Sequence, residues 1–213
     1  FAALSDASFR VRLLRITYVD NQDGSDLTRY GFVIEEDKAV RKRNGLKNVK
    51  ARLVRHDDHD ASRQNLVHVF QYMIGNTEYS LTSPEPNKNC CHNMDLASAT
   101  RQPPYIALPF DFDFSGLVGA EYAEPNPRYP IKTVSERFYK GLCMNNALLP
   151  ETLGLFQQKR EDLFAIIDEI AAIDRKTARA MRPARGYIEK FYKLIDDPDE
   201  VQKQLAERCN DAS

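Results

Sequence analysis

The sequence predicts an α+β fold in which the strands come first and the helices last. Two segments near the N-terminus, residues 9–19 and 28–36, alternate in polarity and contain many β-branched side chains. From about residue 135 to residue 209, apolar side chains instead recur at helical spacing. Runs of strands followed by runs of helices are typical of the α+β class.

Composition places the chain among ordinary globular proteins. It has 213 residues, 42% hydrophobic and 29% charged, enough to bury a hydrophobic core. A net charge of -1 gives no reason to expect nucleic acid or an anionic membrane as a partner. No apolar run approaches the roughly 18 residues of a transmembrane helix, so we expect no membrane span. The chain opens with Phe1, which indicates a processed or truncated product.

The first two strands are predicted to form an antiparallel hairpin. The segment "NQDGSD", residues 21–26, joins them and contains an Asp-Gly step, which is typical of a tight turn. The segment that follows the hairpin is polar and basic, with basic residues at 41–43 and 47–55. These residues predict either a phosphate-facing patch or a solvated surface, and we favour the solvated surface.

Residues 61–76, "ASRQNLVHVFQYMIGN", carry the clearest helix signal. Ser62 is a good N-cap, apolar residues follow at helical spacing, and Gly75 ends the pattern. Just before it, "RHDDHD" at 55–60 contains possible metal ligands. Acidic residues are also favoured by the dipole at a helix N-terminus, and we prefer this interpretation. His68, within the helix, is expected to be packed.

Two short strands are predicted after a proline-containing loop. The first is "CCHNMDLAS", residues 90–98, and a turn at Pro103-Pro104 leads to the second, "YIALPFDFDFSGLV", residues 105–118. Because strand side chains alternate, the three phenylalanines of the second strand should share one face and its two aspartates the other, about 7 Å apart. This pattern fits either an amphipathic strand or a pair of acids that awaits a cation. The residues concerned are Phe110, Phe112 and Phe114 on one face, and Asp111 and Asp113 on the other.

The C-terminal part is predicted to be helical throughout. Asp174 and Asp197 are plausible helix caps, and the aromatic residues Tyr187, Phe191 and Tyr192 are expected in the core. The expected helical segments are "VSERFYKGLCMNNAL", "PETLGLFQQKREDLFAIIDEIAAI", "DRKTARAMRPARGYIEKFYKLI" and "DPDEVQKQLAERC".

The four cysteines form no CxxC motif and no zinc pattern. Adjacent cysteines rarely bond each other, so Cys90 or Cys91 could bridge to Cys143 in an oxidising compartment, and buried free thiols are the alternative. Cys209 has no assigned partner. The compartment stays open, with an exported or periplasmic location favoured slightly over a cytoplasmic one.

Three polar clusters lie at the ends of short apolar elements: Asn76-Thr77-Glu78, His92-Asn93, and Asp111 with Asp113. An acid just past a helix, then an amide, then an aspartate on the next strand is the arrangement of a kinase catalytic lobe. In such a lobe the first acid orients the acceptor hydroxyl, and the amide and aspartate hold metal ions that bridge the phosphates. Oxygen donors of this kind suit Mg²⁺ or Mn²⁺.

The motifs "IGNTEYS", "HNM" and "LPFDFDFSG", in this order, resemble the spore-coat CotH-like atypical kinases and, more distantly, HipA-type kinases. The chain closely resembles a bacterial CotH-like group with a "MIGNTDxS...CCHN...DFDFSGLV" core. The resemblance covers roughly residues 8–145. Each motif is short, and the specificity comes from their order.

This resemblance implies a protein-kinase-like fold, mostly the C-terminal lobe plus the last hairpin of the N-terminal lobe. Residues 1–40 would be the end of the N-lobe and the interlobe hinge hairpin. Residues 41–134 would form the catalytic-loop and metal-binding core, and residues 135–213 a helical subdomain. Glu35 and Glu36, at the hinge, would bind the cofactor.

The resemblance also assigns roles to the polar clusters. Glu78 occupies the position of the catalytic aspartate, while Asn93, Asp111 and Asp113 match metal-binding positions. His92 would point to the opposite face of its strand from Asn93. Because Glu78 is one methylene longer than aspartate, turnover is in question, and the phosphate-binding lysine of a kinase would precede Phe1.

The implied activity is phosphoryl transfer from ATP, with Mg²⁺ or Mn²⁺, to a hydroxyl of a protein or a small molecule. Nucleotidyl transfer with the same residues is a variant of this activity. A pseudokinase that binds nucleotide or a protein partner without turnover is the main alternative, and an α+β domain that binds no nucleotide is a third.

Overall fold

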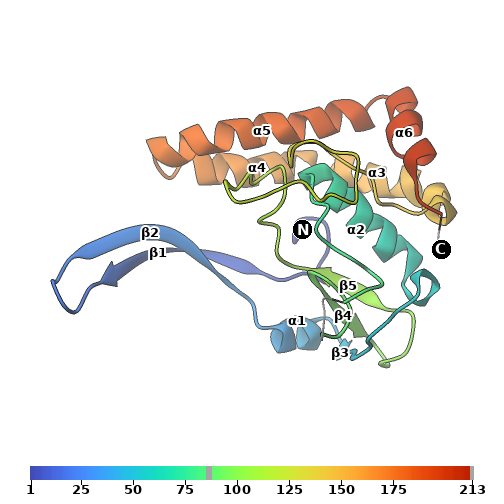
Figure 1. Cartoon of the computed structure of the whole chain (residues 1–213), viewed down its shortest axis with the longest axis horizontal. Helices are drawn as coiled ribbons and strands as arrows, with labels where there is room; N and C mark the ends of the chain where they lie inside the picture. The colour runs from blue at the N-terminus through green and yellow to red at the C-terminus, as the bar shows by residue number, and fades with distance from the viewer. Residues whose placement is uncertain (85–87, 212–213) are drawn as a thin grey trace.

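The computed structural model describes residues 1–84 and 88–211. In this part the chain is a mixed α+β protein, as predicted: two small antiparallel sheets lie in the N-terminal part, and the C-terminal half is helical. Figure 1 shows helix α2 (Ala61–Ile74) between the small sheet and the layer of C-terminal helices. Within the described residues, no helix is both long and apolar enough to cross a bilayer.

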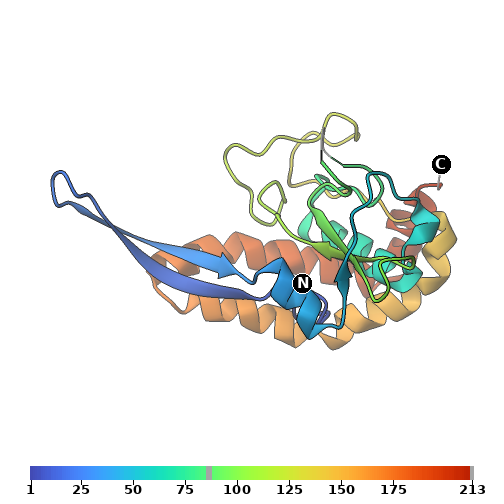
Figure 2. The ribbon, with the colours of Figure 1, turned by 90° about the horizontal axis from the view of Figure 1, so that it is seen from below.

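The predicted N-terminal hairpin is confirmed. Strands β1 (Val11–Val19) and β2 (Asp26–Ile34) pair antiparallel along their whole length, from Val11 opposite Ile34 to Val19 opposite Asp26. The hairpin extends away from the body as an arm (Figures 1 and 2). Large apolar side chains on this arm stay in contact with solvent, and Phe32, for example, is 64% exposed.

The root of the arm is fixed by ion pairs from helix α1 (Asp37–Arg43), which the sequence pattern did not predict. Arg43 pairs with Glu35 at 2.7 Å, and Arg41 pairs with Asp95 at 2.5 Å. The Arg43 guanidinium holds the pKa of Glu35 below its usual value. Arg41 and Arg43 are therefore partly buried in ion pairs, whereas the other basic residues of 41–55 are exposed, in agreement with the favoured solvated surface.

Helix α2 begins slightly earlier than predicted. Asp60 is its N-cap, accepting a hydrogen bond from the Arg63 backbone N–H at 2.8 Å, so Ser62 lies inside the helix. At the other end, Gly75 adopts the left-handed conformation with φ 68°, as the sequence predicted. His68 is buried within α2 as expected.

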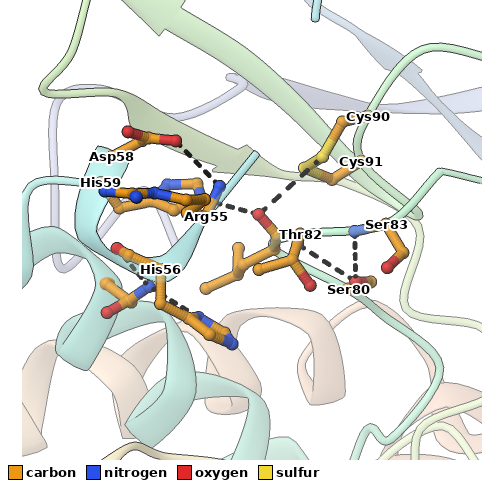
Figure 3. The surroundings of a disulfide bond; sticks show 11 residues. Arg55, His56, Asp58, His59, Ser80, Thr82, Ser83, Cys90 and Cys91 are labelled. Carbon is orange, nitrogen blue, oxygen red and sulfur yellow. Dashed lines mark hydrogen bonds between the residues drawn. A yellow bond between two sulfur atoms is a disulfide. The ribbon is translucent and has the colours of Figure 1, made fainter. Parts of the chain in front are cut away.

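The "RHDDHD" segment forms local hydrogen bonds (Figure 3). Its centre is the 3-10 turn η1 (His56–Asp58), in which the Asp58 carboxylate accepts a hydrogen bond from the Arg55 N–H at 2.9 Å. His59 Nε2 lies 2.6 Å from the Leu81 carbonyl oxygen. Among residues 1–84 and 88–211, no three or more His, Cys, Asp or Glu side chains are grouped to hold a metal.

The second sheet has the order β3-β4-β5 and is antiparallel throughout. Its strands are β3 (Lys47–Asn48), β4 (Met94–Ser98) and β5 (Ile106–Pro109). Strand β5 stops well short of the predicted residue 118, because Asp111 has φ 60° and leaves the extended conformation. The expected two-faced strand over 110–114 was therefore wrong.

The three phenylalanines of this segment instead pack against three different aromatic partners. Their ring centroids lie 6.2 Å from Phe9 for Phe110, 5.4 Å from Phe70 for Phe112, and 5.8 Å from Tyr122 for Phe114. Each contact holds a different part of the loop after β5.

The C-terminal helices agree with the prediction except at two places. Residues 134–142, expected to be helical, form no helix before the 3-10 helix η2 (Cys143–Leu148), and the helix expected to begin at Pro150 is broken into two at Lys159. Asp174 and Asp197 are N-caps, as predicted. Phe191 and Tyr192 are buried, as predicted, whereas Tyr187 is only partly buried. The remaining elements are α3 (Leu149–Gln158), α4 (Arg160–Ala171), α5 (Arg175–Ile195), α6 (Pro198–Gln204) and η3 (Ala206–Arg208).

All four cysteines are paired, so both alternatives from the sequence, a bridge from Cys90 or Cys91 to Cys143 and buried free thiols, were wrong. Cys143 bonds Cys209, and Cys90 bonds its neighbour Cys91. The Cys143 N–H donates to the Asn210 carbonyl at 3.0 Å, which brings the two ends of the helical region together. Cys90 and Cys91 belong instead to the hydrophobic cluster around β4, beside the turn of Ser80, Thr82 and Ser83 (Figure 3).

The C-terminal end of α2 is where the separate parts of the fold meet. The half-buried Arg137 guanidinium donates to the carbonyl oxygens of Tyr72 and Met73 at 3.1 Å and of Tyr187 on α5 at 2.7 Å. From the loop after β5, the Leu117 N–H donates to the Ile74 carbonyl at 2.9 Å. These bonds satisfy carbonyls that a helix end leaves without intrahelical partners.

Gly75 provides a test of this junction. A Cβ at Gly75 would lie 2.0 Å from the Tyr187 hydroxyl and would require a left-handed backbone. We expect Gly75→Ala to lower the free energy of unfolding by about 1–3 kcal/mol. The matched control is Gly154→Ala, because Gly154 lies in α3 and a Cβ there would have no neighbour within 4 Å. There we expect a gain of roughly 0.5–1 kcal/mol from better helix propensity. Urea unfolding measures both, and similar effects of the two changes would contradict this role of Gly75.

Candidate functional site

The loop that follows α2 presents Glu78 and is held by two side-chain amides. The buried Asn76 accepts a hydrogen bond from the Glu78 N–H at 2.9 Å through its Oδ1. Asn93, just before β4, donates from Nδ2 to the Glu78 carbonyl oxygen at 2.8 Å. The amide oxygen of Asn93, which a metal ion would require, takes no part in that bond. Two of the predicted site residues are thus joined directly.

Asn93 and Asp111 lie at the same end of the β4–β5 pair. The Phe110 N–H donates to the Asn93 carbonyl at 3.1 Å, and both residues line a cavity of about 400 Å³, here called the Asp111 cavity. Both have positive φ angles, 55° for Asn93 and 60° for Asp111. Such angles cost of order 1–3 kcal/mol and cluster at functional sites.

Asp111 also lies within hydrogen-bond contact of Asp113, closer than the spacing of about 7 Å that was predicted for a strand. Burial and a hydrogen bond with the Asp113 carboxyl group raise the pKa of Asp111. Asp113 in turn accepts a hydrogen bond from the Tyr122 hydroxyl at 3.0 Å. Two neighbouring carboxylates repel each other when ionised, so a cation between or beside them would be stabilising.

His92 lies beside Glu78, with its Nε2 atom 3.9 Å from Glu78 Oε1. It lines a different cavity from its neighbour Asn93, in agreement with the expected opposite orientation. Strand alternation is not the cause, because β4 begins only at Met94. His92 therefore belongs among the candidate site residues.

A second cavity, of about 560 Å³, is lined by Glu78 and by the residues on either side of it in the loop. We call it the Lys140 cavity. Lys140 Nζ donates to the carbonyl oxygens of Thr77 at 3.1 Å and Tyr79 at 2.5 Å, and it lies 3.9 Å from the centroid of the Tyr79 ring. Burial and the positive charge of Arg128 lower the pKa of Lys140 to about 7.

Lys140 was not among the predicted site residues, because residues 134–148 were expected to form a helix with no functional signal. Two assigned residues are likewise not among the residues that line the cavities. Glu35 is held by Arg43, and Glu36 is at the N-cap position of α1, and neither lines either cavity. Asn93 and Asp111 therefore line the Asp111 cavity, and Glu78 lines the Lys140 cavity. The hydrogen bond from the Asn93 amide to the Glu78 carbonyl oxygen connects the residues of the two cavities.

No protein-family model, curated protein or solved structure matches this chain.

The partly buried Lys140 predicts a specific pH dependence of stability. Its pKa in the folded chain, about 7, is below the ordinary 10.5, so between these values the unfolded chain binds more protons. The free energy of unfolding should therefore rise with pH in this window, by at most about 1.4 kcal/mol per unit from this group. Lys140→Met should remove that contribution, whereas Lys190→Met, at an exposed position on α5, should leave the slope unchanged. Urea unfolding at pH 7, 8 and 9 measures the slopes, and equal slopes for wild type and Lys140→Met would refute the prediction.

Proposed function

We propose that this chain is a kinase-like phosphotransferase of the CotH-like kind, which transfers a phosphoryl group from ATP, with Mg²⁺ or Mn²⁺, to a hydroxyl acceptor. The observation that supports this most is the pair Asn93 and Asp111. Both have left-handed backbones, both line one cavity, and they stand at adjacent ends of β4 and β5. Oxygen donors arranged in this way suit a hard divalent cation.

The order of elements supports the same proposal. A buried helix, a loop with an acid, a short antiparallel strand pair and an aspartate directly after it follow one another along the chain. A kinase catalytic lobe places its catalytic acid, its metal-binding asparagine and its metal-binding aspartate on such elements.

The residues present fit a metal–nucleotide complex. Mg²⁺ is usually held by one or two carboxylates together with substrate phosphates, so Asp111, Asn93 and Asp113 are a sufficient donor set. The bound ion would neutralise charge on the transferred phosphoryl group. Glu78, beside His92, would orient the acceptor hydroxyl and accept its proton.

Glu78 also supports a second candidate, a pseudokinase that binds nucleotide without turnover. Its side chain is longer than that of the aspartate in the resembled family, and it lines a different cavity from Asp111. A displacement of about 1 Å in a catalytic group can cost roughly a hundredfold in rate.

For either candidate, the two disulfides favour an oxidising, exported location.

Nucleotide binding is tested by calorimetric titration of ATP with Mn²⁺ into the wild-type protein and Asp111→Asn. We expect metal-dependent binding that weakens at least tenfold, about 1.4 kcal/mol, in the variant, because a neutral amide holds a cation less strongly than a carboxylate. Asp26→Asn, on the projecting arm, is the matched control and should bind as wild type. No binding by folded wild-type protein would refute both candidates.

Turnover is tested at Glu78 with the Asp and Gln variants. If Glu78 is the catalytic acid position, Glu78→Gln should bind Mn²⁺–ATP normally but lose at least a hundredfold in phosphoryl transfer, since an amide cannot accept the proton. Glu78→Asp should keep more activity than Glu78→Gln. ATP consumption and incorporation of labelled phosphate measure this. Tight nucleotide binding with no turnover in any of the three proteins would select the pseudokinase.

A further inference from the structure

The Lys140 cavity is lined by two cations, Lys140 and Arg128. Lys140 donates to two backbone carbonyls and lies over aromatic rings. Within the part of the chain that the structure describes, neither Lys140 nor Arg128 has a carboxylate within 4.0 Å. Lys140 is partly buried and Arg128 is exposed. A cation held partly away from water without a counter-charge is costly, so a bound anion would stabilise Lys140, and Arg128 is accessible to the same anion.

The two cations act on each other across this cavity. The charge of Arg128 is one cause of the lowered pKa of Lys140, which means that they are close enough to repel each other. A phosphate group carries up to two negative charges at neutral pH and can accept hydrogen bonds from both. The other titratable or charged residues that line the cavity include Glu78, Asp211, His56, His68 and His92.

Hydroxyl and amide groups complete the walls. Ser80 and Ser83 come from the loop after Glu78, and Asn126 comes from the segment that carries Arg128. The volume of about 560 Å³ is within the usual range for a small-molecule site. Glu78 lines this cavity, and its carbonyl oxygen accepts a hydrogen bond from Asn93, which lines the Asp111 cavity.

We propose that the Lys140 cavity binds the acceptor, and that the acceptor is a small hydroxyl compound that already carries a phosphate group held by Lys140 and Arg128. This inference rests on the proposed phosphotransferase function. In the reaction, the acceptor oxygen bonds the γ-phosphorus of ATP, the bond from that phosphorus to the bridging oxygen of ADP breaks, and the hydroxyl proton passes to Glu78. The existing phosphate of the acceptor positions the hydroxyl and does not react.

The first test is titration of inorganic phosphate into the wild-type chain and three variants at pH 7. We expect saturable binding that weakens at least tenfold in Lys140→Met and persists in Lys140→Arg, which keeps the charge. Lys190→Met, the same substitution at an exposed position of α5, should bind as wild type. Circular dichroism and urea unfolding confirm that each variant is folded. Absence of saturable binding, or equal binding by wild type and Lys140→Met, would overturn the proposal.

The second test separates the acceptor from the nucleotide as the source of the phosphate. The phosphate titration is repeated with Mn²⁺ and a non-hydrolysable ATP analogue bound. Unchanged phosphate affinity supports a separate acceptor site, whereas competition would assign Lys140 to the nucleotide and overturn the proposal. If phosphate binds but Mn²⁺–ATP does not, the phosphotransferase function fails and with it the acceptor assignment, although an anion site remains.

Discussion

The fold depends on how the buried C-terminal end of α2 satisfies its last carbonyl groups. A helix end leaves four carbonyls without intrahelical partners, and here water has little access to them. Their partners come from Gly75, from Leu117 in the loop after β5, and from the Arg137 guanidinium, which also binds Tyr187 on α5. Two distant segments, those of Leu117 and Arg137, therefore converge on one helix end because its carbonyls need both donors, and Arg137 ties α5 to the same point.

This convergence also determines where the candidate site forms. The Glu78 loop leaves directly from Gly75, and the Gly116 N–H binds the Gly75 carbonyl at 3.1 Å, only a few residues after Asp111. Lys140 lies three residues beyond Arg137 on the same non-helical segment. The relative positions of the acids and of Lys140 thus follow mainly from hydrogen bonds to the backbone at the end of α2. Substitutions of the site side chains can therefore test their roles in binding and catalysis while these hydrogen bonds are kept.

Short-range sequence patterns predicted correctly those elements whose conformation is determined by residues close together in the sequence. The hairpin, the Gly75 terminus of α2 and the caps Asp174 and Asp197 all follow from turn chemistry, periodicity or a single side chain. The non-helical segment around Arg137 could not be predicted, because its conformation serves contacts with α2 and α5, far away in sequence. Likewise, nothing near Asp111 signals the end of β5, and the proximity of Asn93 to Asp111 followed only from the predicted strand order.

The Cys143–Cys209 disulfide turns the C-terminal helices into a covalent ring that spans 66 positions. Leu142 and Asn210, just outside the ring, form a β-bridge, so the chain enters and leaves the ring at adjacent positions. Glu78, Asn93, Asp111 and Lys140 all lie outside it. If a protease cleaved the turn between α4 and α5, the two pieces would still migrate as one molecule until reduced. Insertions at that turn would likewise enlarge the ring without lengthening the path between the two cavities.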